Sequence, residues 1–199
     1  MSWLQRLRAI LAKTRKYSSF WEWPDKEVKE RGIVRDWIAA TAQNELTGVA
    51  STDRDPPDCI AHDGDGGTVG IEVTELVDQR AVEMNERATC LEDRVYCAWT
   101  LQSVTERIEE IIRHKDSKAV HGGPYARLVL VIHCDEPIVV SPCFPLDALG
   151  QHVFSQPERI TEVYLLLSYR PDPPRQGYYP CVRFRLGKGE DESQLDGQP

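Results

Sequence analysis

The chain has 199 residues, of which 41% are hydrophobic and 28% charged, and this composition predicts one sizeable soluble domain with a core of its own. Its formal net charge is −8. Residues 1–19 carry five basic side chains and no acidic one. The rest of the chain therefore contains 19 of the 24 basic residues and all 32 acidic ones, which gives it a net charge of −13. Such an acidic body argues against broad electrostatic gripping of nucleic acid.

The cysteine pattern indicates free thiols. Six cysteines occur without a C-x-x-C pair or a regular spacing, and no signal peptide precedes them, so we expect a reducing, cytoplasmic location. Buried cysteine that acts as a small hydrophobic residue is the favoured interpretation. The alternative is a zinc site, although its scattered spacing is unlike that of structural zinc sites. Its ligands would be Cys134, Cys143, His152 and Cys181.

Residues 1–24 form a basic N-terminal segment with its own pattern. Apolar residues at helical spacing predict an amphipathic helix over residues 2–16, too short to cross a bilayer and followed by a connector. We expect this helix to pack on the domain or on a second copy of the chain. A membrane-surface helix or a nucleic-acid-binding arm is the alternative.

Asp25 is suited to cap a helix over residues 26–42. Glu30 falls on the stripe that we expect to be buried, and a carboxylate at such a position needs an ionic partner or a bound ligand. The other members of that stripe are Val28, Val34, Trp37, Ile38 and Thr41. A short strand is expected at residues 48–51.

A β-hairpin is predicted over residues 57–62 and 68–74. Two short apolar runs flank the segment His62-Asp-Gly-Asp-Gly-Gly67, and Gly and Asp at this density are typical of a tight reversal. If Asp65 lies at the centre of the turn, the hairpin places Asp58 directly opposite Glu72.

Side-chain alternation divides this hairpin into two faces. The apolar face consists of Cys59, Ala61, Val69, Ile71 and Val73, and the mostly polar face of Asp58, Ile60, His62, Thr68, Glu72 and Thr74. Like charges directly across a hairpin are destabilising. The facing carboxylates of Asp58 and Glu72 therefore predict a cation between them, for which a divalent metal is the best candidate.

Residues 79–119 contain neither Pro nor Gly and predict one long helix or two broken ones. An apolar face is defined by Val104, Ile108, Ile111 and Ile112. Two lysines, Lys115 and Lys118, continue this face at its C-terminal end. We expect one ammonium group to lie within roughly 8 Å of the Glu72 carboxylate, a gap that one water or ion spans. The alternative is that both lysines reach past the core edge to solvent.

The remaining elements complete an α/β domain over residues 25–187. Continuous apolar runs predict strands buried on both faces at 126–134 and 161–169, with a short helix at 144–154 between them. An alternating strand is expected at 178–186. The acidic segment 188–199 is predicted to be a disordered tail.

This order of elements, with Pro57-Asp58 and Glu72-Val73-Thr74 in the hairpin after the first helix, resembles the PD-(D/E)XK nuclease superfamily. The resemblance covers about residues 25–169. It implies a restriction-endonuclease-like fold, in which helices flank a central mixed β-sheet in the order α-β-β-β-α-β.

The resemblance also implies the roles of individual residues. Asp58, Glu72 and the carbonyl of Val73 would hold Mg²⁺, or alternatively Mn²⁺. Thr74 stands where members of the superfamily carry a lysine that acts on the attacking water, and a hydroxyl cannot replace that charge. Some members carry the lysine on the next helix, so Lys118, which we favour, or Lys115 would replace it. Glu30 matches an inward carboxylate of the first helix, and Gln79 a polar residue after the motif.

We therefore expect a magnesium-dependent nuclease that hydrolyses phosphodiester bonds in DNA, with RNA as the alternative substrate. A homodimer or a partner protein would help an acidic body to hold that substrate. Two other interpretations stay open: a catalytically inactive binding or scaffold module on the same fold, and a peripheral assembly protein led by the N-terminal helix. The segment Asp63-Gly-Asp65 resembles part of a calcium loop, but the Glu that such a loop requires falls at Thr74.

Overall fold

The computed structural model describes residues 26–53, 56–78, 81, 83–84, 98–136, 138–168 and 180–187. The predicted helix at 2–16, Gln79 and the predicted tail at 188–199 lie outside these residues. Among the described residues, no helix is both long enough and apolar enough to span a bilayer.

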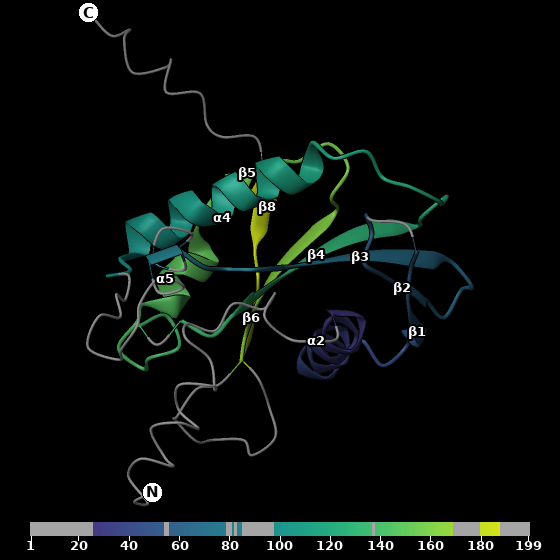
Figure 1. Cartoon of the computed structure of the whole chain (residues 1–199), viewed down its shortest axis with the longest axis horizontal. Helices are drawn as coiled ribbons and strands as arrows, with labels where there is room; N and C mark the ends of the chain where they lie inside the picture. The colour runs from purple at the N-terminus through teal and green to yellow at the C-terminus, as the bar shows by residue number, and fades with distance from the viewer. Residues whose placement is uncertain are drawn as a thin grey trace, which may run out of the picture.

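A mixed six-stranded sheet forms the centre of the described part, with strand order β1-β2-β3-β4-β6-β7 (Figure 1). Strands β1, β2 and β3 pair antiparallel, β3, β4 and β6 pair parallel, and β7 is antiparallel to β6. The strands are β1 (Thr47–Ser51), β2 (Cys59–His62), β3 (Thr68–Glu75), β4 (Arg127–Cys134), β6 (Glu162–Leu167) and β7 (Cys181–Arg183). The class is α/β, as the sequence predicts.

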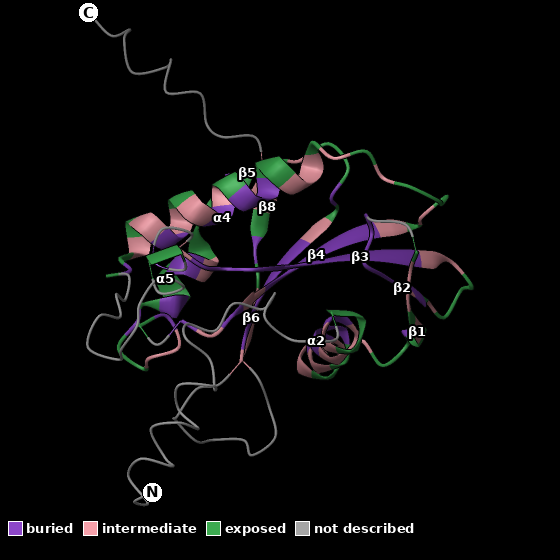
Figure 2. Cartoon of the chain, in the orientation of Figure 1, coloured by how far each residue is buried: buried purple, intermediate pink, exposed green. Residues whose placement is uncertain are grey.

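Two helices cover opposite faces of this sheet, α2 (Lys26–Thr41) on one and α4 (Leu101–Asp116) on the other (Figure 1). Val34 and Trp37 of α2 pack on Val129 and Val131 of β4, whereas α4 packs on the alternate residues of that strand. Because both faces are covered, β4 is apolar and buried from Leu128 to Ile132 (Figure 2). Each side chain of the central strands therefore points either toward α2 or toward α4.

The hairpin of β2 and β3 has the register that the sequence predicts. Ile60 pairs with Gly70 and His62 with Thr68, and the ladder begins at Cys59, one residue after Asp58. The apolar face packs under α2, as expected. Glu72 therefore faces the side of the sheet on which α4 lies, because successive strand residues point to opposite faces.

A capping box fixes the beginning of α4. The hydroxyl of Thr100 accepts a hydrogen bond from the Ser103 N–H, and the Ser103 hydroxyl accepts one from the Thr100 N–H. The stripe of Val104, Ile108 and Ile111 is buried against the sheet. This burial sets the rotation of the helix about its axis, and with it the direction of every residue that continues the stripe.

Three local predictions were wrong. The helix predicted at 144–154 is shorter, α5 (Leu146–Gln151), because the chain continues into β5 (Val153–Ser155). The strand predicted at 178–186 is divided at the buried Phe184 into β7 and β8 (Arg185–Gly187), and β8 pairs in parallel with β5 instead of joining the main sheet. Val28 of α2 is 54% exposed, whereas Ile33 takes a place in the buried stripe.

Candidate functional site

The Asp58 carboxylate lies immediately before β2 and connects the hairpin to helix α2. Its Oδ2 accepts a hydrogen bond from the backbone N–H of Val73 at 2.8 Å, so it lies beside the peptide bond that joins Glu72 to Val73. Its Oδ1 faces Nζ of Lys26, in the first turn of α2, at 3.4 Å. The Asp58 carboxylate therefore lies beside the backbone that follows Glu72, whereas its ionic partner belongs to α2. That the carboxylates of Asp58 and Glu72 face each other stays a prediction.

Glu72 of β3 forms a buried ion pair with Lys115 of α4. Nζ of Lys115 donates to Oε1 of Glu72 at 2.5 Å, and the two side chains are only 10% and 4% exposed. Lys115 lies four residues after Ile111 and seven after Ile108, so it continues the buried face of the helix. The prediction that an ammonium group of this helix comes within roughly 8 Å of the Glu72 carboxylate is confirmed.

The structure brings Lys115, not Lys118, to Glu72. Lys118 lies beyond the last residue of α4, where its carbonyl oxygen accepts a hydrogen bond from the Arg159 guanidinium at 2.5 Å. The contacts of the described residues therefore give no support to the preference for Lys118. Thr74 is buried in β3 on the same face as Glu72, as its position in the strand requires.

Glu30 is buried on α2, as the sequence predicts, and lies close to Asp58. Burial, together with the negative charge of Asp58, raises the pKa of the Glu30 carboxyl to about 7, although Lys26 opposes this rise. Oε1 of Glu30 lies 3.2 Å from Nζ of Lys26, but it accepts no hydrogen bond from the part of the chain that the structure describes. Lys26 is the shared partner of both acids and was not predicted from the sequence, although its i, i+4 spacing to Glu30 was a signal.

Because the pKa of Glu30 is higher in the folded chain than its ordinary value of 4.5, the folded chain holds this proton more tightly than the unfolded chain does. Stability without metal should therefore fall as pH rises from about 4.5 to about 7, by up to about 3 kcal/mol. Glu30→Gln removes this loss, so we expect its melting temperature in EDTA to exceed that of wild type at pH 8 by roughly 5–10 °C and to match it near pH 4.5.

The control for this comparison is Glu27→Gln on the exposed side of the same helix turn, which should melt like wild type at both pH values. Thermal melts followed by circular dichroism provide the measurement. If Glu30→Gln kept the wild-type pH dependence, another group would be responsible for it.

The candidate site combines three buried acids with two lysines that come from helices on opposite faces of the sheet. Asp58, Glu72 and Glu30 are buried acids, and Lys26 and Lys115 are their basic partners, which leaves a net charge of −1 when all five are ionised. No group of three or more His, Cys, Asp or Glu side chains in the described ranges is arranged to hold a metal ion. A metal here would therefore depend on two carboxylates and a backbone carbonyl, a ligand set that suffices for Mg²⁺ because this ion keeps several waters.

The other metal interpretations find no support. Cys134 is buried in β4 while Cys143 is exposed, and the four described cysteines are free thiols. The Asp63 carboxylate is used within the hairpin turn, where Oδ1 accepts hydrogen bonds from the N–H groups of Gly67 at 2.6 Å and Asp65 at 3.2 Å. This is the role of an aspartate that stabilises a turn.

Comparisons with known proteins do not assign a family to this site. No protein-family model, no curated protein and no solved structure matches the chain.

Proposed function

We propose that the chain is a magnesium-dependent nuclease that hydrolyses phosphodiester bonds in DNA, with RNA as the alternative substrate. The observation that carries this proposal is the contact between Lys115 and Glu72. The strand position at which a PD-(D/E)XK nuclease would have its lysine is Thr74 here. Helix α4 supplies an ammonium group to the same face of the sheet instead.

The architecture supports the restriction-endonuclease-like interpretation. In the described part, α2, β1, β2, β3, α4 and β4 follow one another in the order α-β-β-β-α-β, and the antiparallel hairpin joins a parallel pair at β3. Asp58 and Glu72 lie in this hairpin, and Glu30 lies on the helix that precedes it. The contact of Asp58 with the Val73 N–H and the closeness of Glu30 to Asp58 support this interpretation beyond the motif alone.

The residues present fit a divalent cation. Asp58, Glu72 and the Val73 carbonyl would hold it, and the excess of one negative charge that the site has when Glu30 is ionised would favour its binding. When bound, Mg²⁺ would withdraw charge from a phosphate oxygen and make a neighbouring water more acidic.

The protein side chains supply the positioning. Lys115 is fixed by the packing of α4 and by its contact with Glu72, so its Nζ would donate hydrogen bonds to the attacking water or to the phosphate oxygen that gains charge. Oδ2 of Asp58 is oriented by the Val73 N–H, and a cation at Oδ1 would take the place of the Lys26 ammonium group, which now lies 3.4 Å from that oxygen. Both contacts are present without a substrate, and groups that are positioned before the substrate arrives accelerate a reaction most.

A second candidate function is a binding or scaffold module with no catalytic activity. The observation that favours it is that Lys26 and Lys115 already neutralise Asp58 and Glu72 directly. In that case the charged cluster would be structural, and a buried ion pair would link α4 to the sheet.

One experiment separates these functions. Purified protein is incubated with supercoiled plasmid and with single-stranded DNA in Mg²⁺, in Mn²⁺ and in EDTA, beside a Glu72→Ala control, and Mg²⁺ binding is measured by calorimetry. We expect metal-dependent cleavage by wild type and none by Glu72→Ala. Equal cleavage by both would reveal a contaminating nuclease, and the absence of both cleavage and Mg²⁺ binding would favour the scaffold module.

A further inference from the structure

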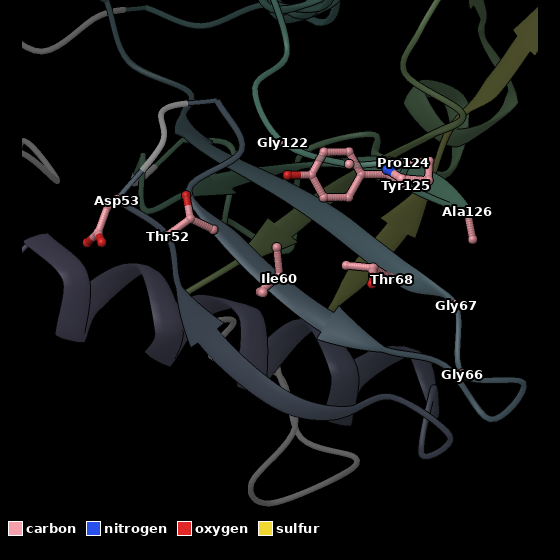
Figure 3. Close-up of a pocket in the computed structure, with 11 residues that line it drawn as sticks. Thr52, Asp53, Ile60, Gly66, Gly67, Thr68, Gly122, Pro124, Tyr125 and Ala126 are labelled. Atoms are coloured by element: carbon pink, nitrogen blue, oxygen red, sulfur yellow. The ribbon is translucent and has the colours of Figure 1, made fainter.

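A cavity of about 720 Å³ lies between the hairpin and the loop that enters β4 (Figure 3). Ile60 of β2 and Thr68 of β3 form its floor, and they belong to the same face of the hairpin as Glu72. Thr68 precedes Glu72 by four residues, roughly 13 Å along a strand. The cavity is therefore a neighbour of the candidate site on the same surface.

The ring of Tyr125 forms a fixed wall of this cavity. A Cβ at Gly70 would lie 3.3 Å from Cδ1 of Tyr125, and one at Gly123 would lie 3.3 Å from Cδ2, so the absence of side chains at both glycines admits the ring. The Tyr125 hydroxyl donates to the carbonyl oxygen of His121 at 2.7 Å. Because its polar tip is engaged within the loop, the ring offers apolar aromatic surface to the cavity.

The rest of the lining favours a flat, uncharged ligand. Glycines at 66, 67, 122 and 123 leave backbone groups at the surface instead of side chains, and Thr52 and Thr68 add hydroxyl groups. Asp53 is the one charged side chain among the described residues that line the cavity, and it lies at the rim with its carboxylate directed away from Tyr125 (Figure 3). An acidic rim repels phosphate, so the cavity suits the uncharged part of a nucleotide.

We propose that this cavity binds one unpaired nucleobase against the ring of Tyr125, which makes single-stranded nucleic acid the substrate of the neighbouring site. The inference rests on the proposed function, because that function places the phosphate at Glu72 and Lys115. Bases inside a duplex are stacked on their neighbours, so an aromatic side chain stacks only on a base that has left the duplex.

Base stacking also resolves a difficulty posed by the charge of the chain. Affinity for duplex DNA comes largely from phosphate neutralisation by many basic residues, which a net charge of −8 disfavours. Stacking on an aromatic ring supplies affinity without additional phosphate contacts. A substrate held by one base and one phosphate is therefore compatible with an acidic protein.

The test measures binding of a fluorescent single-stranded oligonucleotide to the full chain by anisotropy in EDTA, so that binding is observed without cleavage. Tyr125→Leu removes the ring and is expected to weaken binding about tenfold, within the range that alanine substitution of stacking residues produces. Tyr125→Phe retains the ring and is expected to bind like wild type. An oligonucleotide with abasic positions keeps its phosphates, and its binding should be weak and the same for all three proteins.

The outcomes distinguish this inference from the proposed function. If wild type binds the normal and abasic oligonucleotides equally, or if Tyr125→Leu binds as tightly as wild type, the base subsite is wrong even if the protein cleaves DNA. If Tyr125→Leu lowers affinity selectively for the oligonucleotide with bases while Mg²⁺ and Mn²⁺ elicit no cleavage, the subsite stands and the nuclease function is wrong. If Tyr125→Leu does not fold, the comparison of normal and abasic oligonucleotides on the wild-type protein still tests the base subsite.

Discussion

Replacement of Lys115 by methionine is expected to lower the rate of Mg²⁺-dependent phosphodiester cleavage by at least about a hundredfold, the usual minimum for loss of a positioned proton-transfer group. Methionine keeps an apolar stem of similar length, so α4 should still pack on the sheet, with a lower melting temperature in EDTA because the buried Glu72 loses its partner. Affinity for Mg²⁺ should not fall, because the ammonium group competes with the metal for Glu72 and is not itself a ligand. Cleavage rates and calorimetric Mg²⁺ binding, measured on the same preparations, provide the test.

The matched control for this substitution is Lys118→Met, three residues further along and beyond the end of α4. It should retain wild-type cleavage. If Lys118→Met lost activity and Lys115→Met did not, the site would use the helix end, as the sequence first suggested. If neither variant lost activity, the hypothesis that a lysine of α4 acts on the attacking water would be wrong, and another group would activate that water.

Glu72→Ala is expected to lower the melting temperature in EDTA at neutral pH by roughly 10 °C. The pairing of Asp58 with Glu72 in the hairpin, taken by itself, predicts the opposite, because removing one of two facing carboxylates relieves repulsion. The ion pair with Lys115 reverses this expectation. Loss of Glu72 leaves an ammonium group that is only 10% exposed, and breaking a buried pair in this way costs about 3 kcal/mol or more. For a chain of this size, each kcal/mol of lost stability lowers the melting temperature by about 2–4 °C.

The double variant Glu72→Ala/Lys115→Met shows whether the pair is the cause. Removing both partners leaves no isolated buried charge, so the double variant should melt well above Glu72→Ala. Asp58→Ala is a useful comparison, because its partner Lys26 is 43% exposed and keeps its hydration. We expect a smaller fall for Asp58→Ala. If the change in melting temperature of the double variant equalled the sum of the changes caused by the two single substitutions, a direct coupling between Glu72 and Lys115 would be contradicted.

The sequence contains the information for the hairpin because that information is local. A glycine- and aspartate-rich turn determines which residues of β2 and β3 face each other, and alternation then assigns every side chain to a face. Slippage by one residue would move Cys59, Ile71 and Val73 out of the core, so burial reinforces the register. The inward position of Glu30 follows in the same way from helical periodicity.

The C-terminal third was less predictable because its pairing is not local. The alternating run at 178–186 is typical of one strand, yet Phe184 is buried and divides it between two sheets. Residues 153 and 154 were assigned to a helix because their strand partner lies about thirty residues later in the chain. Local propensity cannot reveal such a partner, and strand formation at these positions depends on it.

The sequence by itself determined the class of fold, the face of the sheet that carries Glu72, and the helix that brings a lysine to Glu72. Only the tertiary structure decided between Lys115 and Lys118, because the choice depends on where α4 ends and how its axis crosses β3. The same is true of the cavity beside Tyr125. Its walls come from the hairpin and from a loop more than fifty residues later, and only the packing of these two segments places an aromatic ring over Gly70.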